Sequence, residues 1–303
     1  MNMLNMRAGV AGAGCKWAAR AVALGLGLAL VGFGCASMGP RDSGTHYAEK
    51  AVMPFIGKGS CPGAISVLYK DGRQEVACMG WANVEKKIPM SMDRTFMICS
   101  QTKGFCGVCV AMLVEEGKLN LDDPVSKYLP EFKNLKIVTK DKDGVETLRP
   151  AKNVLTVRHV MSHTGGFPFE VPFKETLGWP GAPLRVTAAA AAAYPLNFEP
   201  GTQSLYSNTG IDIGAAIVEV VSGQRFDVFL KERVLGPLGM KDTTFQPTDA
   251  QLARSISLYG VSSNAPAEFV AFNPWMPLPH NGPTVFPSAG AGLWSTSTDL
   301  LKF

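Results

Sequence analysis

The stretch FMICSQTKGF, residues 96–105, decides how the sequence is interpreted. Ser100 stands three residues before Lys103, and apolar residues such as Ile98 and Phe105 surround the pair. On a helix, residues three apart share a face, so the hydroxyl and the amine would be in contact. A lysine in dry surroundings can act as a base, and a serine beside a base is an activated nucleophile. On these residues alone, a chance Ser-x-x-Lys pair whose lysine reaches the surface is the better interpretation.

Length and composition indicate a globular protein. The chain has 303 residues, of which 46% are hydrophobic and 18% are charged. Such a chain can bury a substantial core as one large domain, or as one domain with an inserted subdomain. The formal net charge is +4, and three of the basic residues, Arg7, Lys16 and Arg20, lie in the first 34 residues, which hold no acid. The rest of the chain is therefore nearly neutral, and we expect no nucleic-acid partner.

The N-terminus has the pattern of an export signal. A basic opening leads into the apolar run AVALGLGLALVGFG (21–34), which is short for a membrane span and is followed by Cys35. The glycine-cysteine junction resembles the processing site of bacterial lipoproteins. We therefore expect a signal peptide over 1–34, lipidation of Cys35, and a linker over 35–48. Cleavage after Ala36 and an uncleaved transmembrane anchor are the alternatives. The expected location is the periplasm or the cell-envelope membrane, with the lipid as the membrane anchor.

Five further cysteines follow Cys35, and an odd number in an exported protein argues against a complete disulfide framework. Cys106 and Cys109 have the spacing of a redox motif. They lie, however, in an apolar segment, 104–116, that is typical of a buried helix, where cysteine packs as a small hydrophobic residue. We favour this packing role over redox or metal chemistry.

The remaining sequence alternates helix and strand signals. Two β-rich runs joined through Asp71-Gly72 predict a hairpin, and Gly117 predicts the end of the 104–116 helix. Charged residues 133–153 suggest a surface excursion, and 244–287 reads as largely irregular. The expected strands are 64–70 and 74–82, and further helices are expected from Asp122, over 156–163, over the alanine run 188–193, over 211–223, from Phe226, and from Ser297 or Thr298.

Several kinds of chemistry find no support in the sequence. It has no Gly-x-Ser-x-Gly elbow, no His-Glu-x-x-His motif and no phosphate-binding glycine loop. His159 and His163 are four residues apart, but no acid stands between them, and we interpret them as organisers of a loop. We therefore expect neither a metal nor an organic cofactor.

A second motif strengthens the case for Ser100. Tyr206-Ser207-Asn208 lies in a turn-rich loop just after Pro200-Gly201. A tyrosine near a lysine cation can relay a proton, and an asparagine can hold both a carbonyl and an amine of a substrate. The simpler interpretation is an ordinary turn with an amphipathic tyrosine at its edge.

Taken together, the motifs resemble the β-lactamase-related serine hydrolases, the group of class C β-lactamases, D-alanyl-D-alanine carboxypeptidases and related esterases. The resemblance runs from about residue 50 to the end. Its phrases, in order, are VEEGKLNLDDPVSKYLPEF (114–132), LTVRHVMSHTGG (155–166), FEPGTQSLYSNTG (198–210), VLGPLGMKDT (234–243) and AGAGLWSTSTDLLKF (289–303). They are specific for the family and say little about the substrate.

The resemblance implies a role for each site residue. Ser100 resembles the acylated nucleophile, Lys103 the partner that takes its proton, Tyr206 the tyrosine that shares acid and base duty, and Asn208 the residue that orients the substrate. An oxyanion hole would use the backbone N–H of Ser100. The implied reaction is hydrolysis of an amide, lactam or ester through an acyl-enzyme. The substrate would be a small molecule or derived from peptidoglycan, and we expect a monomer.

The implied fold is α+β: an antiparallel sheet flanked by helices, with a mostly helical subdomain, over residues 49–303. One family feature is absent from the sequence. The third motif, Lys- or His-x-Gly on a strand downstream of the segment resembling 289–303, does not occur. We therefore expect the domain to be incomplete, with its C-terminal strands missing. The alternative function is an inactive penicillin-fold protein that binds without turnover. Ser162 is the rival nucleophile.

Overall fold

The computed structural model describes residues 46–57, 59–171, 182–261, 269–271 and 286–303. The predicted signal peptide, the lipidation site at Cys35 and most of the expected linker lie outside these residues. Thr45–Phe303 form one unit. Within the described ranges, no helix combines the length and apolarity needed to cross a bilayer.

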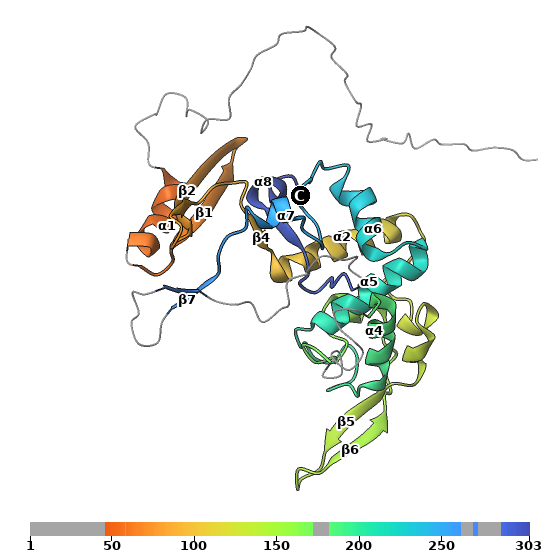
Figure 1. Ribbon diagram of the computed structural model, residues 1–303. Helices are drawn as coiled ribbons and strands as arrows, with labels where there is room; N and C mark the ends of the chain where they lie inside the picture. Colours follow the sequence, from red (N-terminus) through yellow and green to blue (C-terminus); the bar gives the residue numbers. More distant parts are fainter. Residues whose placement is uncertain (1–45, 58, 172–181, 262–268, 272–285) are drawn as a thin grey trace, which may run out of the picture. The chain divides into compact units, whose positions relative to one another are not determined.

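The predicted N-terminal hairpin is present. Strand β1 (Gly63–Lys70) pairs antiparallel with β2 (Arg73–Asn83), so Asp71 and Gly72 alone make the turn. Both turn residues have positive φ, 50° and 75°, which is the conformation that matches the twist of a two-residue hairpin. Strand β3 (Ile88–Pro89) extends this sheet, and helix α1 (Tyr47–Gly57) packs against β1 and β2 (Figure 1).

The described strands form four small sheets, all with antiparallel pairing, where the sequence resemblance implied one sheet. Besides β1–β2–β3, strand β4 (Thr95–Met97) pairs with β9 (Trp294–Thr296), β5 (Lys136–Lys140) with β6 (Glu146–Pro150), and β7 (Tyr259–Val261) with β8 (Phe269–Ala271). The β4–β9 pair matters for the site, because it joins the segment before Ser100 to the C-terminal segment.

In the segment 122–153 the structure keeps one expectation and corrects another. The surface excursion at 133–153 contains a strand pair, β5–β6, whose loop is closed by the Asp141 carboxylate accepting from the N–H groups of Asp143 and Val145. The helix expected from Asp122 is instead two short 3₁₀ segments, η2 (Val125–Lys127) and η3 (Pro130–Asn134). Pro130 lacks the N–H that a continuous α-helix would need at this point.

The core is built on two long helices that pack against each other, α2 (Thr102–Glu115) and α5 (Asn208–Ser222). Phe105 and Leu113 of α2 are buried, and so are Cys106 and Cys109, as the packing interpretation expected. Both thiols are free, and burial raises the pKa of Cys109 to about 12 and that of Cys106 well above its usual range. They therefore remain neutral, which fits a packing role.

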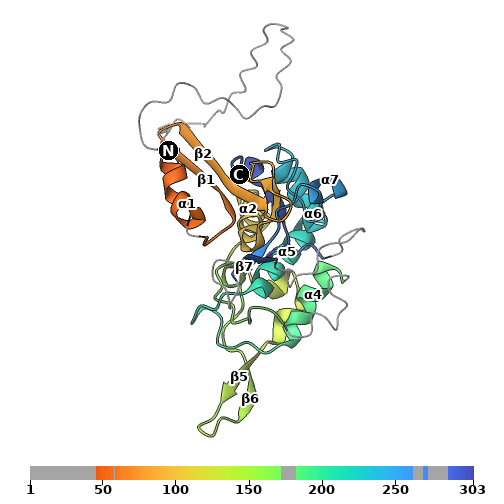
Figure 2. The same ribbon diagram turned by 60° about the vertical axis from the view of Figure 1, so that its left-hand side comes forward.

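Shorter helices surround α5 (Figure 2). Three of them, α3, α4 and α6, contact α5 directly. The bounds are α3 Val157–Met161, α4 Leu184–Ala190 continued by η4 Ala191–Ala193, α6 Phe226–Leu230 continued by the π-helical η5 Lys231–Leu235, α7 Asp249–Leu252 and α8 Ser297–Leu300.

Candidate active site

A sharp change of backbone direction presents Ser100. Strand β4 ends at Met97, and the 3₁₀ helix η1 (Cys99–Gln101) then runs into α2. Cys99, the first residue of η1, has φ +45°. Few non-glycine residues adopt this conformation, and those that do are concentrated at functional sites. Ser100 is exposed, and its N–H lies at the N-terminal end of the helical segment, where amides have no partner within the helix.

The Lys103 ammonium has three hydrogen-bond acceptors. Its Nζ lies 3.1 Å from Ser100 Oγ, 2.5 Å from Asn208 Oδ1 and 2.6 Å from the carbonyl oxygen of Gly290. An ammonium group has three N–H bonds, so protonated Lys103 can donate to each of these oxygens. Lys103 is thereby directed at the serine hydroxyl by two acceptors that are distant in sequence.

Tyr206 lies against the same lysine. Lys103 Nζ is 4.5 Å from the centre of the tyrosine ring, and 46% of Tyr206 remains exposed. Burial works to raise the pKa of Tyr206, but hydrogen bonding with Lys103 and Ser100 outweighs it and holds the pKa below its ordinary value. The phenolate form of Tyr206 is therefore reached at lower pH than in a free tyrosine, and as a phenolate it can accept a proton.

Asn208 has a fixed amide orientation. It is the first residue of α5, and the preceding Ser207 caps this helix by accepting from the N–H of Gly210. Its Nδ2 donates to Glu170 Oε1 at 2.8 Å, while its Oδ1 accepts from Lys103. Because an ionised carboxylate only accepts and an ammonium only donates, the reverse orientation of the amide is excluded.

The two histidines organise loops, in agreement with the sequence interpretation. His159 Nδ1 accepts from the N–H of Thr156 and completes the capping box of α3. His163 Nδ1 accepts from the N–H of Ser207, and its ring lies 4.5 Å from that of Tyr206. Burial, together with the positive charge of Lys103, lowers the pKa of His163, so the neutral ring supports the tyrosine.

The structure thus brings together Ser100, Lys103, Tyr206 and Asn208, the four residues named from the sequence. Sequence reasoning missed two partners of these residues, the Gly290 carbonyl and the Glu170 carboxylate. The run of small residues around Gly290 was the one local signal of this contact, because glycine is favoured where the backbone must approach another segment of the chain closely.

Substitution of Gly290 by alanine tests the close approach at the site. A Cβ at this position would lie 2.7 Å from Asn208 Cβ, closer than real contacts allow. The Gly290 carbonyl or the Asn208 amide must then move away from Lys103. Since a misplacement of about 1 Å can cost about 10²-fold in rate, we expect kcat for the ester hydrolysis that the family resemblance implies to fall about 10²-fold.

Gly107→Ala is the matched control, because a Cβ at this position in α2 has nothing within 4 Å. It should leave kcat unchanged and raise the melting temperature, since alanine favours helix over glycine. A Gly290→Ala variant with the kcat of Gly107→Ala would contradict the assigned geometry.

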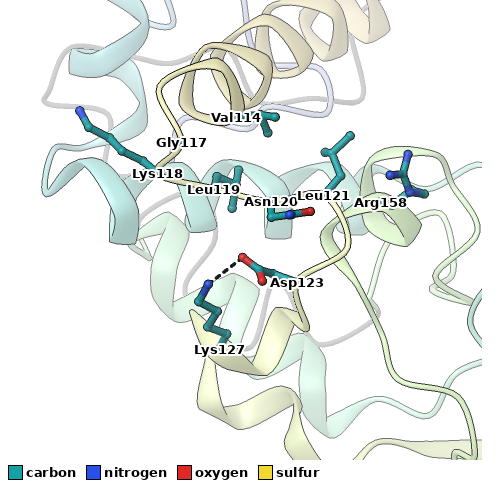
Figure 3. A pocket seen from close by; sticks show the side chains of 9 residues that line it. All are labelled: Val114, Gly117, Lys118, Leu119, Asn120, Leu121, Asp123, Lys127 and Arg158. Carbon is teal, nitrogen blue, oxygen red and sulfur yellow. Dashed lines mark hydrogen bonds and ion pairs between the residues drawn. The ribbon is translucent and has the colours of Figure 1, made fainter. Parts of the chain in front are cut away.

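A separate cavity of about 470 Å³ lies at the C-terminal end of α2 and does not include Ser100 (Figure 3). The charged side chains that line it form ion pairs, one within the lining and the others with acids outside it. Lys127 Nζ is 2.8 Å from Asp123 Oδ2, and Arg158 donates twice to the carboxylate of Asp122. Within the described residues, no group of three or more His, Cys, Asp or Glu side chains could hold a metal ion.

Comparison with known proteins gives relatives over most of the chain. Protein Rv1367c of Mycobacterium tuberculosis (strain ATCC 25618 / H37Rv) is 29% identical over 262 residues, covering 84% of this chain and 64% of that protein. The chain therefore spans slightly less than two thirds of the length of this relative.

Solved structures and a family model give the same assignment. EstCE1, described as a hydrolase with promiscuous acyltransferase activity, is 26% identical, with a TM-score of 0.65 over 84% of this chain and 70% of that one. The octameric penicillin-binding protein homologue from Pyrococcus abyssi is 25% identical, with a TM-score of 0.61 over 84% of this chain and 54% of that one. The family model described as Beta-lactamase matches residues 48–303. The chain therefore belongs to the beta-lactamase family.

Proposed function

We propose that the protein is a serine hydrolase that transfers the acyl group of an ester to Ser100 and then to water. The distance of 3.1 Å between Ser100 Oγ and Lys103 Nζ carries this proposal, because it pairs a nucleophile with a base. The hydrolase and acyltransferase description of EstCE1 supports acyl transfer, and we take an ester as the first substrate class to test. Lactams and D-amino peptides are the alternatives within the same chemistry.

In the acylation step, Ser100 attacks the substrate, Lys103 and Tyr206 handle the proton, and a backbone N–H stabilises the oxyanion. Ser100 Oγ forms a bond to the substrate carbonyl carbon while its proton passes to the Lys103–Tyr206 pair, of which one member, as the Lys103 amine or the Tyr206 phenolate, is already deprotonated. The oxyanion that develops is stabilised by the N–H of Ser100, at the positive end of the helical segment. The bond to the alcohol then breaks, and the proton held by the pair passes to the departing oxygen.

Deacylation repeats these steps with water as the nucleophile. The water proton passes to the same pair, the hydroxide oxygen bonds to the acyl carbon, and Ser100 Oγ takes the proton back as the carboxylic acid leaves. Asn208 and Gly290 hold Lys103 in place throughout, so the base does not reorient between the two half-reactions.

Covalent labelling followed by mass spectrometry tests the proposal. The protein is treated separately with a fluorophosphonate, a penicillin and an activated acyl ester, and the modified peptide is identified. We expect the fluorophosphonate and the ester to add their mass to the peptide containing Ser100. If none of the three reagents modifies Ser100, the enzyme assignment is wrong and a binding function without turnover is favoured.

A further inference from the structure

The third acceptor of Lys103 belongs to a turn, and something must hold that turn in place. Gly290 lies in the segment between Phe286 and β9, where Gly292 N–H donates to the Ser288 carbonyl oxygen at 2.9 Å. A local turn of this kind fixes its own shape but not its position against α2. The position of the Gly290 carbonyl therefore depends on contacts made from outside the turn.

Asp212 makes such contacts. Its Oδ1 accepts from the backbone N–H of Gly290 at 3.1 Å and from the Ser288 hydroxyl at 3.3 Å. Asp212 is only 5% exposed. A buried carboxylate is costly unless hydrogen bonds replace its hydration, so its contacts with the turn are strong and directional.

Helix α5 brings Asp212 and Asn208 to one face, because residues four apart on a helix are neighbours. The turn lies directly against this face, since no Cβ would fit at Gly290 beside Asn208. One helix therefore governs two of the three acceptors of Lys103: Asn208 Oδ1 directly, and the Gly290 carbonyl through Asp212.

We propose that Asp212 is a positioning residue of the active site, which holds the 288–290 turn so that the Gly290 carbonyl receives the Lys103 ammonium. Asp212 acts through Gly290 and takes no part in the reaction itself. The expected effect on kcat rests on the proposed hydrolase function. The expected effect on the position of the Gly290 carbonyl rests on the hydrogen bonds alone.

The Asp212→Ala variant should lose turnover more than substrate binding. Without the carboxylate the turn can shift, and Lys103 loses a fixed acceptor. We expect kcat for the ester to fall roughly 10- to 100-fold with KM nearly unchanged, as for a misplaced catalytic group. Asp212→Asn keeps an oxygen acceptor and should retain most of the wild-type kcat.

Asp299→Ala is the matched control. Asp299 is also buried, and it also accepts from a backbone N–H, that of Asp242 at 2.7 Å, but its partners, among them Thr243 and Lys302, lie outside the 288–290 turn. Both alanine variants should melt at lower temperature. Only Asp212→Ala should show a reduced kcat when each is assayed well below its own melting temperature.

A crystal structure of Asp212→Ala separates this inference from the proposed function. We expect Gly290 O to lie beyond hydrogen-bond distance of Lys103 Nζ in the variant. If the contact of 2.6 Å persists, or if kcat equals that of Asp299→Ala, the positioning role is wrong. Absence of turnover in the wild type would overturn the hydrolase proposal, and the structure would still decide the role of Asp212.

Discussion

Replacing Ser100 with alanine is expected to abolish ester hydrolysis and covalent labelling while leaving the fold intact. Ser100 is exposed and makes its side-chain contact with Lys103, so removing one oxygen disturbs no core packing. Removal of a nucleophile that acts as part of a catalytic unit typically lowers kcat by roughly 10⁴- to 10⁶-fold. Steady-state kinetics with an activated ester, together with the melting temperature, would measure both effects.

Ser162→Ala is the appropriate control, because Ser162 is the rival nucleophile. Its hydroxyl donates to the carbonyl oxygen of Arg158 at 2.8 Å and lies 2.9 Å from Thr164 Oγ1, which is a loop-stabilising arrangement. We expect this variant to keep its activity. Full hydrolysis by Ser100→Ala, or its loss in Ser162→Ala, would place the nucleophile elsewhere.

Replacing Lys103 with methionine should be nearly as severe as replacing Ser100. Methionine has a similar length but no N–H, so Ser100 loses its base and the Asn208 and Gly290 oxygens lose their donor. Members of a catalytic unit fail together, and we expect kcat to fall by about 10⁴-fold or more. Each buried acceptor left unpaired also costs about 1–3 kcal/mol, so the melting temperature should fall as well.

A surface lysine provides the comparison for this variant. Lys127 has a 57% exposed side chain and an ion pair with Asp123, and such pairs contribute little to stability. Lys127→Met should therefore match the wild type in both kcat and melting temperature. If Lys103→Met keeps kcat within tenfold of Lys127→Met, Lys103 is not the base.

The sequence was sufficient for features that depend on local spacing. Ser100 and Lys103 are one helical turn apart, and Asp71-Gly72 has the chemistry of a two-residue hairpin, so short-range geometry specified both. The buried positions of Cys106 and Cys109 followed from the apolar helix around them. The family resemblance is confirmed by the match over residues 48–303.

Features created by contacts between distant segments escaped prediction. Lys103 and Gly290 are 187 positions apart, and a backbone carbonyl has no residue-specific signature. Asp212 stands between Ile211 and Ile213 in α5, and its partners could not be inferred before the turn was placed. The β5–β6 pair was missed because most of its side chains are exposed, so no alternation of apolar and polar residues marks it.

The alkylation rate of the buried thiols of α2 measures how often the helix that carries Lys103 opens. Cys99 is exposed and should react with a thiol reagent at once, whereas Cys106 and Cys109 are shielded and neutral. These two can be alkylated only when α2 separates from the helices packed against it. Their slow modification under native conditions therefore counts such openings, as amide exchange does for backbone hydrogens. A substrate analogue bound at Ser100 should lower the alkylation rate of Cys106 and Cys109, because it stabilises the closed arrangement on which the site depends.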